Sequence, residues 1–427
     1  MINELLGRKR KTSRISKLID SEGNITNNPV SMANSFNDYF SNIATNLKSN
    51  IFESGGRNGD ENYHQTYLKN SVSNTLFLNV VEASEVYDVI RNFKNKTTRD
   101  TKIISLKLAN KSYNFTSTLA SIVNKSFQQG VFPEQMKLAR VIPVHKEGPK
   151  TDVGNYRPIS LLNSFSKIYE KLMYNRLMEF LELNNSLYEN QYGFRPQRSC
   201  EHALLNAQNI LLESLSKRQI SLLLLIDFSK AFDMVEHQIL LEKLNHYGIR
   251  GPVLKWLESY LSNRKQFVSI NGSDSETSTL DYGVPQGSIL GPLLFIIYIN
   301  DIPNIAEFAK FILYADDANI ILTGNTIEEI NCQLEKLVSN LKQWVNCNGL
   351  ALNLKKTKYI IFSRTRNTEL PQPLVISGTP IDRVYESKFL GVIIDESLNW
   401  TRHIRTVEAK MARYIGIMYK IKKNIYQ

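Results

Sequence analysis

The chain has 427 residues, 42% of them apolar and 22% charged, and this composition excludes a largely disordered protein. Lysine and arginine outnumber aspartate and glutamate by 11, so we expect a polyanionic partner, either nucleic acid or an acidic membrane surface. The three cysteines are too few and too far apart for a disulfide framework, and no apolar stretch is long enough to cross a membrane. These features predict an intracellular protein without a membrane partner.

The N-terminal 75 residues combine a basic run with one expected helix. Basic side chains are dense between Arg8 and Lys17, which suits a nuclear address or a phosphate-binding arm and equally suits a solvated surface. Apolar residues recur at helical spacing from Pro29 to Leu47, whereas Asn50 to Asn74 is polar and contains glycine. We interpret residues 1–75 as a basic N-terminal extension and linker, in which a helix is followed by a loop.

Two acidic positions follow apolar segments that have the character of strands. Ser221 to Ile226 is a short, continuous apolar run, which predicts a fully buried strand that ends at Asp227. Phe308 to Leu322 is apolar on both sides of Asp316 and Asp317, which predicts two strands joined by a tight acidic turn. Burial explains the apolar runs but does not explain the carboxylates.

Other segments complete the expected fold. An apolar helical face runs from Phe165 to Phe180, and Thr326 to Glu329 is a capping box that opens a second amphipathic helix. Tyr359 to Phe362 and Phe389 to Ile394 read as further strands, and the basic, amphipathic stretch from Arg402 to Lys423 reads as a helix. The order of elements predicts an α+β domain with an antiparallel sheet packed on helices.

The three aspartates suggest phosphoryl-transfer chemistry. Adjacent strands lie about 4.8 Å apart, so the end of one strand and a neighbouring hairpin can present carboxylates to a shared ion. Like charges so placed repel unless a cation compensates them, and carboxylate oxygens suit Mg²⁺. Two such ions can stabilise the attacking and the leaving oxygen of an in-line transfer. Asp227, Asp316 and Asp317 are therefore candidate ligands for two Mg²⁺ ions, with Mn²⁺ as a substitute.

Seven short motifs in a fixed order resemble those of reverse transcriptases, and Tyr314 to Asp317 alone would be a weak signal. In chain order the motifs are Asn155 to Leu161, Gln191 to Arg195, Asp227 to Asp233, Gly283 to Ser288, Tyr314 to Asp317, Asn353 to Thr357 and Phe389 to Val392. The residues of these motifs resemble those of the reverse transcriptases of non-LTR retrotransposons of the LINE type, especially the jockey and CR1 kinds. The resemblance extends over roughly Asn27 to Asp395.

The resemblance implies a right-hand polymerase with fingers, palm and a partial thumb. We expect the fingers with the start of the palm in residues 76–220, and the palm, with some fingers helices interleaved, in residues 221–395. Residues 396–427 would begin a truncated thumb. One departure lies in the fingers, where the family usually carries glycines and this chain has Thr98 to Lys102, which puts local shape and template handling in doubt.

The resemblance also assigns metal and nucleotide roles. Asp227, Asp316 and Asp317 would be catalytic and hold the metals, with the Phe228 carbonyl as a further ligand. Gln286 and Gly287 would line the site where the incoming nucleotide pairs with the template, since glycine permits close backbone approach and an amide can bond sugar or base. Phe232 would exclude the ribose 2′-hydroxyl, and its alternative interpretation is a plain core aromatic.

Further roles fall on the fingers and on the end of the palm. Lys146 and Arg157 would bind the triphosphate, although Lys146 also suits a solvated turn. Lys356 would protonate the leaving pyrophosphate, with Lys355 and Lys358 as alternatives for the same role. The primer grip would consist of Phe389, Leu390 and Gly391.

The expected activity is RNA-directed DNA synthesis, primed from a nick in target DNA. The partners would be an RNA template, a DNA primer or nicked target DNA, and deoxynucleoside triphosphates, with nuclear location during integration and cytoplasmic location during translation. The alternative is an inactive or domesticated relic that binds RNA or DNA without polymerising. A nucleotide cyclase with a similar sheet is disfavoured by Gln286 and Gly287. The sequence leaves the copied RNA and the oligomeric state open.

Overall fold

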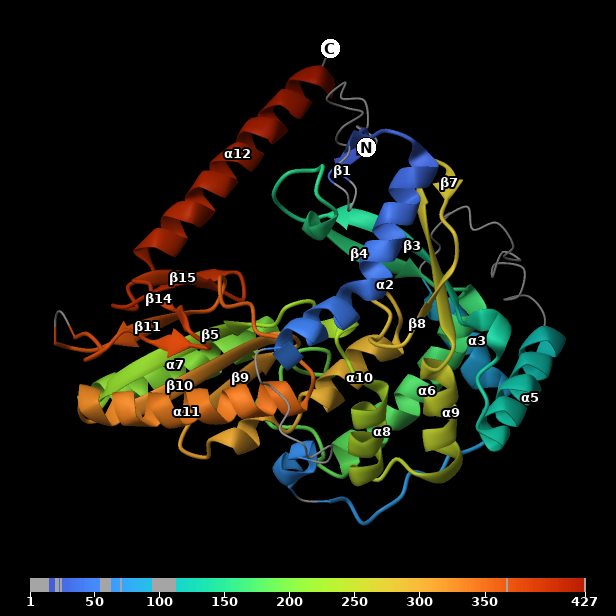
Figure 1. The fold of residues 1–427 in the computed structure, drawn as a ribbon, viewed down its shortest axis with the longest axis horizontal. Coiled ribbons are helices and arrows are strands. Elements are labelled where there is room, and N and C mark those ends of the chain that lie inside the picture. The colour runs from blue at the N-terminus through green and yellow to red at the C-terminus, as the bar shows by residue number, and fades with distance from the viewer. Residues whose placement is uncertain are drawn as a thin grey trace.

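The computed structural model describes residues 15–19, 23, 25–53, 63–69, 71–93, 113–365 and 368–425. Most of the basic run, Arg8 to Arg14, lies outside these residues, and so does the departure at Thr98 to Lys102. Helices and strands mix along the chain and pack around two main sheets, as Figure 1 shows. The expectation of an α+β fold is confirmed.

The main sheet contains the strand that the sequence predicts to be buried. Its order is β14 (Asp382–Arg383), β11 (Lys358–Phe362), β5 (Ile220–Asp227), β10 (Asp317–Gly324) and β9 (Lys310–Tyr314). All neighbours are antiparallel except β14, which pairs with β11 in parallel. The antiparallel sheet expected from the sequence is therefore present, with one short parallel edge strand.

Helices cover both faces of the main sheet, which explains the continuous apolar run of β5. Leu222 and Leu224 belong to the core shared with α11 (Ile327–Cys347), whereas Leu223 and Leu225 pack with α7 (Cys200–Ser216). Alternate side chains of a strand point to opposite faces, so a strand covered on both faces can be apolar at successive positions, as β5 is from Leu222 to Ile226. Its end, at Asp227, is where the carboxylate reaches the surface.

The second sheet joins segments that are distant in the sequence. Its order is β4 (Tyr156–Leu161), β3 (Leu138–His145), β6 (Arg264–Ile270) and β7 (Ser273–Asp274), and β8 (Ser278–Leu280) also pairs with β6. β3 and β6 are parallel and lie on either side of the expected boundary at residue 220. Strands as well as helices are thus interleaved between the two expected units.

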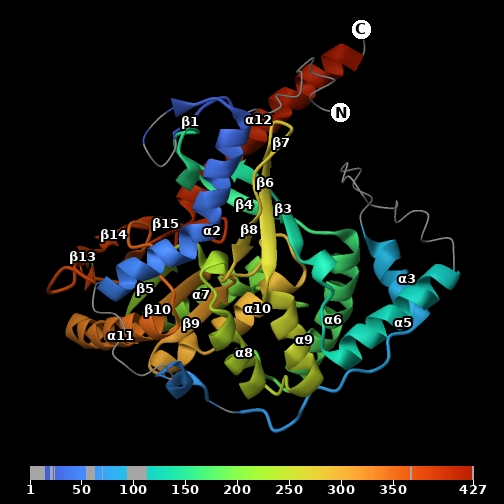
Figure 2. The ribbon, with the colours of Figure 1, turned by 45° about the vertical axis from the view of Figure 1, so that its right-hand side comes forward.

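The helix α2 (Pro29–Glu53) packs on the second sheet, as Figure 2 shows. Its buried Phe36 and Phe40 share a core with Val141 and Val268 of that sheet. The described part of residues 1–75 is therefore packed into the fold, and residue 75 does not mark a separation in packing.

The remaining elements surround these sheets. On the N-terminal side they are β1 (Leu18–Ile19), β2 (Ile25–Thr26), η1 (Tyr63–Tyr67), α3 (Ala83–Asn92), α5 (Tyr113–Gln129), η2 (Glu134–Met136), η3 (Val153–Asn155) and α6 (Ser164–Leu183). In the middle they are η4 (Ala231–Asp233), α8 (His237–His246), α9 (Gly251–Leu261), α10 (Leu290–Tyr298) and η5 (Ile302–Ile305). Towards the C-terminus they are β12 (Val375–Ile376), β13 (Thr379–Pro380), β15 (Glu386–Phe389), β16 (Val392–Asp395) and α12 (Thr401–Ile425).

Several local predictions are confirmed. The helical patterns correspond to α2, α6, α11 and α12, and the acidic turn joins β9 to β10. The capping box forms with a one-residue shift, because the Thr326 hydroxyl accepts from the Glu329 N–H while the Glu329 carboxylate accepts from the Asn325 N–H. In both figures α12 projects away from the body, and most of its side chains are exposed. None of the helices in the described ranges is long and apolar enough to span a membrane.

Two local predictions are wrong. Phe389 to Ile394 is not one strand but the tip of the β15–β16 hairpin, where Leu390 and Gly391 have φ values of 45° and 96°. Adjacent residues in the left-handed region form a two-residue hairpin turn, which reverses the chain between Phe389 and Val392. The expected loop from Asn50 to Asn74 contains the end of α2 and the 3-10 helix η1.

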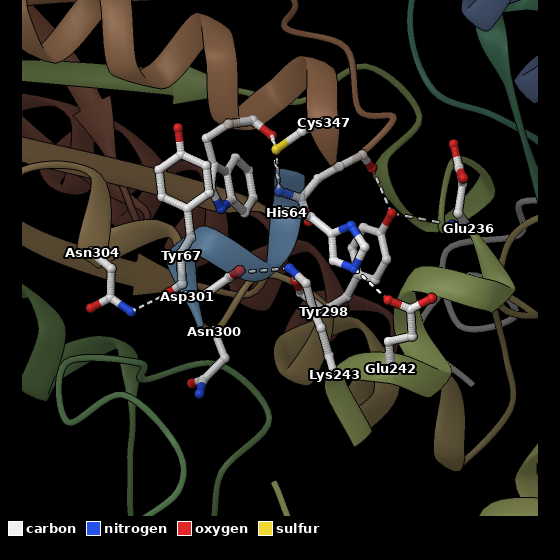
Figure 3. A network of polar contacts seen from close by, with 12 residues as sticks. His64, Tyr67, Glu236, Glu242, Lys243, Tyr298, Asn300, Asp301, Asn304 and Cys347 are labelled. Carbon is white, nitrogen blue, oxygen red and sulfur yellow. Dashed lines mark hydrogen bonds and ion pairs between the residues drawn. The ribbon is translucent and has the colours of Figure 1, made fainter. Parts of the chain in front are cut away.

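Polar contacts attach η1 to the helices and turns around it, and a buried ion pair lies nearby (Figure 3). The His64 imidazole is buried and pairs with Glu242 of α8 at 2.8 Å. On the same helix, Lys243 pairs with Asp301 at 2.7 Å, and both side chains are fully buried. These contacts join residues about 180 and 60 positions apart, which local sequence patterns do not report.

Candidate active site

The central feature of the site is a cross-strand pair of carboxylates. Asp227 at the end of β5 is the direct partner of Asp317 at the start of β10, and Asp316 lies in the turn before it. Ala315, the other turn residue, has a φ of 55°, so the turn is tight. The structure therefore brings together the three aspartates selected from the sequence.

Two of the three carboxylates, Asp316 and Asp317, have a raised proton affinity. Partial loss of hydration and the neighbouring Asp316 and Asp227 raise the pKa of Asp317 to about 6. Desolvation, followed by the charge of Asp227, also raises the pKa of Asp316. The positive charges of Lys146 and Arg157 oppose both shifts. An additional cation at this position would relieve the repulsion.

The donor set fits a hard divalent ion that takes part of its coordination from substrate. Within the described ranges, no three Asp, Glu, His or Cys side chains converge closely enough to form a metal site by themselves. Mg²⁺ normally retains waters and binds one or two carboxylates together with substrate phosphates, so a preformed cage is not required. The residues that would hold it are Asp227, Asp316 and Asp317.

The hydrogen bonds on either side of Phe228 determine the direction of its carbonyl group. Ser229 donates to the Ala351 carbonyl, and the Asp227 carbonyl accepts from Asn353, so the flanking residues make the contacts to that segment. In an antiparallel pair the residue between them directs its own N–H and C=O to the opposite side. The Phe228 carbonyl is thus directed towards the edge on which β10 lies, while its side chain is buried.

Cations from three separate segments approach the carboxylates. Lys146 follows β3 and Arg157 lies in β4, both exposed, and their charges act on Asp316 and Asp317. Partial burial, then the charges of Arg157 and Lys356, lower the pKa of Lys146. Lys356 pairs with Glu147 at 2.7 Å, and this bond is the main reason that the Lys356 pKa is raised. The second sheet thus supplies positive charge opposite the acidic end of the main sheet.

A pocket at one end of the central strands of the main sheet is lined by the acidic pair and by two of the three residues of the expected primer grip. Asp227, Asp317 and Lys356 line it together with Phe389 and Leu390 of the β15–β16 hairpin. The other lining residues are Leu225, Ile226, Asn319, Lys358 and Lys388. Gly391 lies at the exposed tip of the same hairpin. Of the alternative lysines, Lys356 and Lys358 line this pocket.

The expected nucleotide-selecting residues lie on two segments, 232 and 284–287, that hydrogen-bond to each other and to β4. The Phe232 ring stacks on the Phe295 ring with centroids 4.6 Å apart. The Phe232 backbone carbonyl accepts a hydrogen bond from the Val284 N–H at 2.8 Å. The Gln286 carbonyl accepts from the Ser160 N–H at 2.8 Å. Gly287 has a φ of 126°, and a Cβ there would lie 2.4 Å from the Ser160 carbonyl oxygen. Close packing on β4 requires glycine at this position.

Two residues that received no role from the sequence support the acidic turn. The Gln191 side-chain oxygen accepts from the N–H groups of Gly193 and Ala315, at 2.9 and 3.2 Å. Gly193 lies against the turn, since a Cβ on it would be 2.3 Å from the Ala315 nitrogen. Both residues belong to the motif Gln191 to Arg195, which supports the family resemblance but by itself predicts no contact with the acidic turn.

A third residue that received no role is Asn353, in the motif that precedes Lys356. Its side-chain nitrogen donates to Asp227 Oδ2 at 2.9 Å, and its N–H donates to the Asp227 carbonyl at 2.8 Å. Two hydrogen bonds to one residue fix both the backbone and the side chain of Asp227. The remaining Asp227 lone pairs are left for a metal ligand role.

Comparison with known proteins gives the family. A family model described as reverse transcriptase (RNA-dependent DNA polymerase) matches residues 144–394, which is more than half of the chain. The chain belongs to the reverse transcriptase family. The matched range contains every motif element of the site described above, from Lys146 to Gly391.

The relatives come from non-LTR retrotransposons. The RNA-directed DNA polymerase from mobile element jockey of Drosophila melanogaster is 30% identical over 388 residues, covering 85% of this chain and 42% of the relative. The probable RNA-directed DNA polymerase from transposon BS of the same species is 31% identical, covering 67% of this chain and 32% of the relative. The probable polymerase from transposon X-element is 26% identical, with 96% and 45% covered. The chain spans about a third to a half of their length, and the resemblance to LINE-type reverse transcriptases is confirmed.

Proposed function

We propose that this chain is the RNA-directed DNA polymerase region of a non-LTR retrotransposon and that it adds deoxynucleotides to a primer 3′-hydroxyl. The observation that carries the proposal is the pairing of Asp227 with Asp317 across two strands, beside Asp316 and opposite Lys146 and Arg157. Such a juxtaposition of carboxylates and phosphate-binding cations suits transfer of a nucleotidyl group.

The right-hand arrangement is part of the proposal. The main sheet with α11 and α7 corresponds to the palm, and the second sheet with α2 corresponds to the fingers. The exposed amphipathic α12 corresponds to the start of the thumb, with one face for packing and basic side chains for phosphates. The contact of β4 with Gln286 and Gly287 supports this proposal, because it would bring the fingers against the nucleotide site.

In the proposed reaction, each group of the site has one task. Asp227, Asp316 and Asp317, with the Phe228 carbonyl, would hold two Mg²⁺ ions, for which Mn²⁺ could substitute. Bound Mg²⁺ supplies charge neutralisation at the attacking 3′-oxygen and at the leaving pyrophosphate. Lys146 and Arg157 hold the triphosphate by charge and hydrogen bonds.

The remaining residues select the nucleotide, help the pyrophosphate to leave and hold the primer. Phe232 occupies the space that a ribose 2′-hydroxyl would need, and Gln286 with Gly287 lines the position of the incoming nucleotide. Lys356 donates its proton to the pyrophosphate oxygen as the bond to the α-phosphorus breaks. Phe389, Leu390 and Gly391 hold the primer end. We propose nicked target DNA as the primer source and, for the living cell, a cytoplasmic stage followed by a nuclear one.

Primer extension on an RNA template in Mg²⁺ tests the proposal. We expect Asp317→Asn to lower the rate constant by about 10³-fold or more, since one metal ligand and one charge are lost. Asp382→Asn is the matched control, because Asp382 is an exposed aspartate on the edge strand of the same sheet. A parent protein that binds primer–template but adds no nucleotide in Mg²⁺ or Mn²⁺ would show a non-polymerising relic. Equal extension by the parent and Asp317→Asn would refute the site.

A further inference from the structure

Asp233 connects the motif that carries Asp227 to the motif that carries Gln286. It ends the short helix η4, six positions after Asp227, and has no task in the reaction proposed above. The Gln286 side-chain nitrogen lies 3.0 Å from Asp233 Oδ1 and 2.9 Å from Oδ2. This contact joins residues 53 positions apart, at the wall of the nucleotide site.

The contact fixes which end of the Gln286 amide faces which way. An ionised carboxylate can only accept hydrogen bonds, so it selects the amide nitrogen and turns the amide oxygen away. Burial raises the pKa of Asp233 to about 6, whereas the hydrogen bond from Gln286 and the nearby Lys230 ammonium favour the ionised carboxylate. A hydrogen bond to a charged partner is stronger than a neutral one and resists reorientation.

Main-chain hydrogen bonds fix the backbone around Gln286, but they do not orient its side-chain amide. The Ser160 N–H holds the Gln286 carbonyl, and the Phe232 carbonyl holds the Val284 N–H. Gly283 lies so close that a Cβ on it would be 2.9 Å from the Asp233 carbonyl oxygen. The main chains of both motifs are thus locked together, and the Asp233 carboxylate completes the arrangement.

We propose that Asp233 is a positioning residue for nucleotide binding: it holds the Gln286 amide with Oε1 free to accept a hydrogen bond from the incoming nucleotide. The inference rests on the proposed function, because it assumes that Gln286 lines the nucleotide site. It adds a group that does not touch the substrate and that acts through its effect on Gln286.

The test is a double-mutant cycle with Asp233→Asn and Gln286→Met, measured as kcat/KM for a deoxynucleoside triphosphate in primer extension. Asn can present either a donor or an acceptor, so Asp233→Asn allows both orientations of the amide, and we expect kcat/KM to fall about 10- to 100-fold, mainly through KM. In the Gln286→Met background the same substitution should change kcat/KM by less than about twofold. Asp281→Asn, an exposed aspartate before the Gln286 loop, is the matched control and should leave kcat/KM unchanged.

Two outcomes would overturn the inference. One is an additive cycle, in which Asp233→Asn costs as much without the Gln286 amide as with it. The other is a change confined to thermal stability, with KM unaltered. If Asp233→Asn does not fold, Asp233→Glu replaces it in both backgrounds, and its effect must likewise disappear with Gln286→Met. A parent protein that extends no primer would refute the proposed function, whereas a coupling of the two residues in thermal unfolding would still support the contact.

Discussion

Replacing Gly193 with alanine should impair catalysis by displacing the acidic turn. The added Cβ would lie 2.3 Å from the Ala315 nitrogen and 2.9 Å from the Tyr314 carbonyl carbon, whereas ordinary contact begins at 3.4 Å. Backbone must therefore move by about 1 Å, since neither neighbour is a flexible side chain. Gly193 is not in the left-handed region, so steric space alone makes the substitution costly.

The expected magnitudes for Gly193→Ala follow from this displacement. A shift of about 1 Å at a catalytic group typically lowers the rate by about 10²-fold, and we expect that loss in the single-turnover rate constant. Overpacking of this kind also lowers the free energy of unfolding by about 1–3 kcal/mol. The rate effect should exceed what partial unfolding explains, because the clash is with the turn that carries Asp316 and Asp317.

The assay is single-turnover primer extension on an RNA template, with thermal unfolding followed on the same samples. Gly416→Ala is the matched control, because Gly416 lies in exposed α12 with nothing within 4 Å of an added Cβ. Alanine there should leave the rate unchanged and stabilise the helix by about 0.5–1 kcal/mol. A folded Gly193→Ala protein that extends primer within about twofold of the parent would refute the reasoning.

Three further predictions follow from the site. Without divalent ions at pH 7, Asp317→Asn should raise the unfolding midpoint. The folded-state pKa of Asp317 is raised to about 6, so its ionisation lowers the stability of the folded protein as the pH rises from about 4 to 6. Scanning fluorimetry with and without Mg²⁺ should show that the ion stabilises the parent more than the variant. Phe232→Val should lower discrimination against ribonucleotides by about tenfold or more in competition assays, and unchanged discrimination would exclude the steric role. Lys356→Met should lower the maximal rate by about 10²- to 10⁴-fold, whereas Lys355→Met, at an exposed neighbouring lysine, should not, and equal effects would contradict the assignment of the proton donor.

Some features of this protein follow from local sequence alone. A short, continuous apolar run is typical of a strand that is buried on both faces, so Ser221 to Ile226 predicts the buried β5 and places Asp227 at its end. The capping box before α11 and the acidic turn between β9 and β10 are equally local, since their signals lie within a few residues. The order of motifs then indicates the family without any knowledge of contacts.

The tertiary structure decided the contacts between those local elements. Pairing of β3 with β6 and of β4 with the Gln286 loop brings Lys146 and Arg157 to the carboxylates, and no periodicity reports such pairing. The tip of the β15–β16 hairpin was missed because its turn residues include Leu390, whose positive φ is unusual for a leucine. The contacts of Gln191 and Gly193 with the acidic turn arise only when two distant segments pack, since a hydrogen-bond partner and a steric limit exist only in three dimensions. The sequence therefore determined which residues are candidates for the chemistry, and packing determined which residues hold them in place.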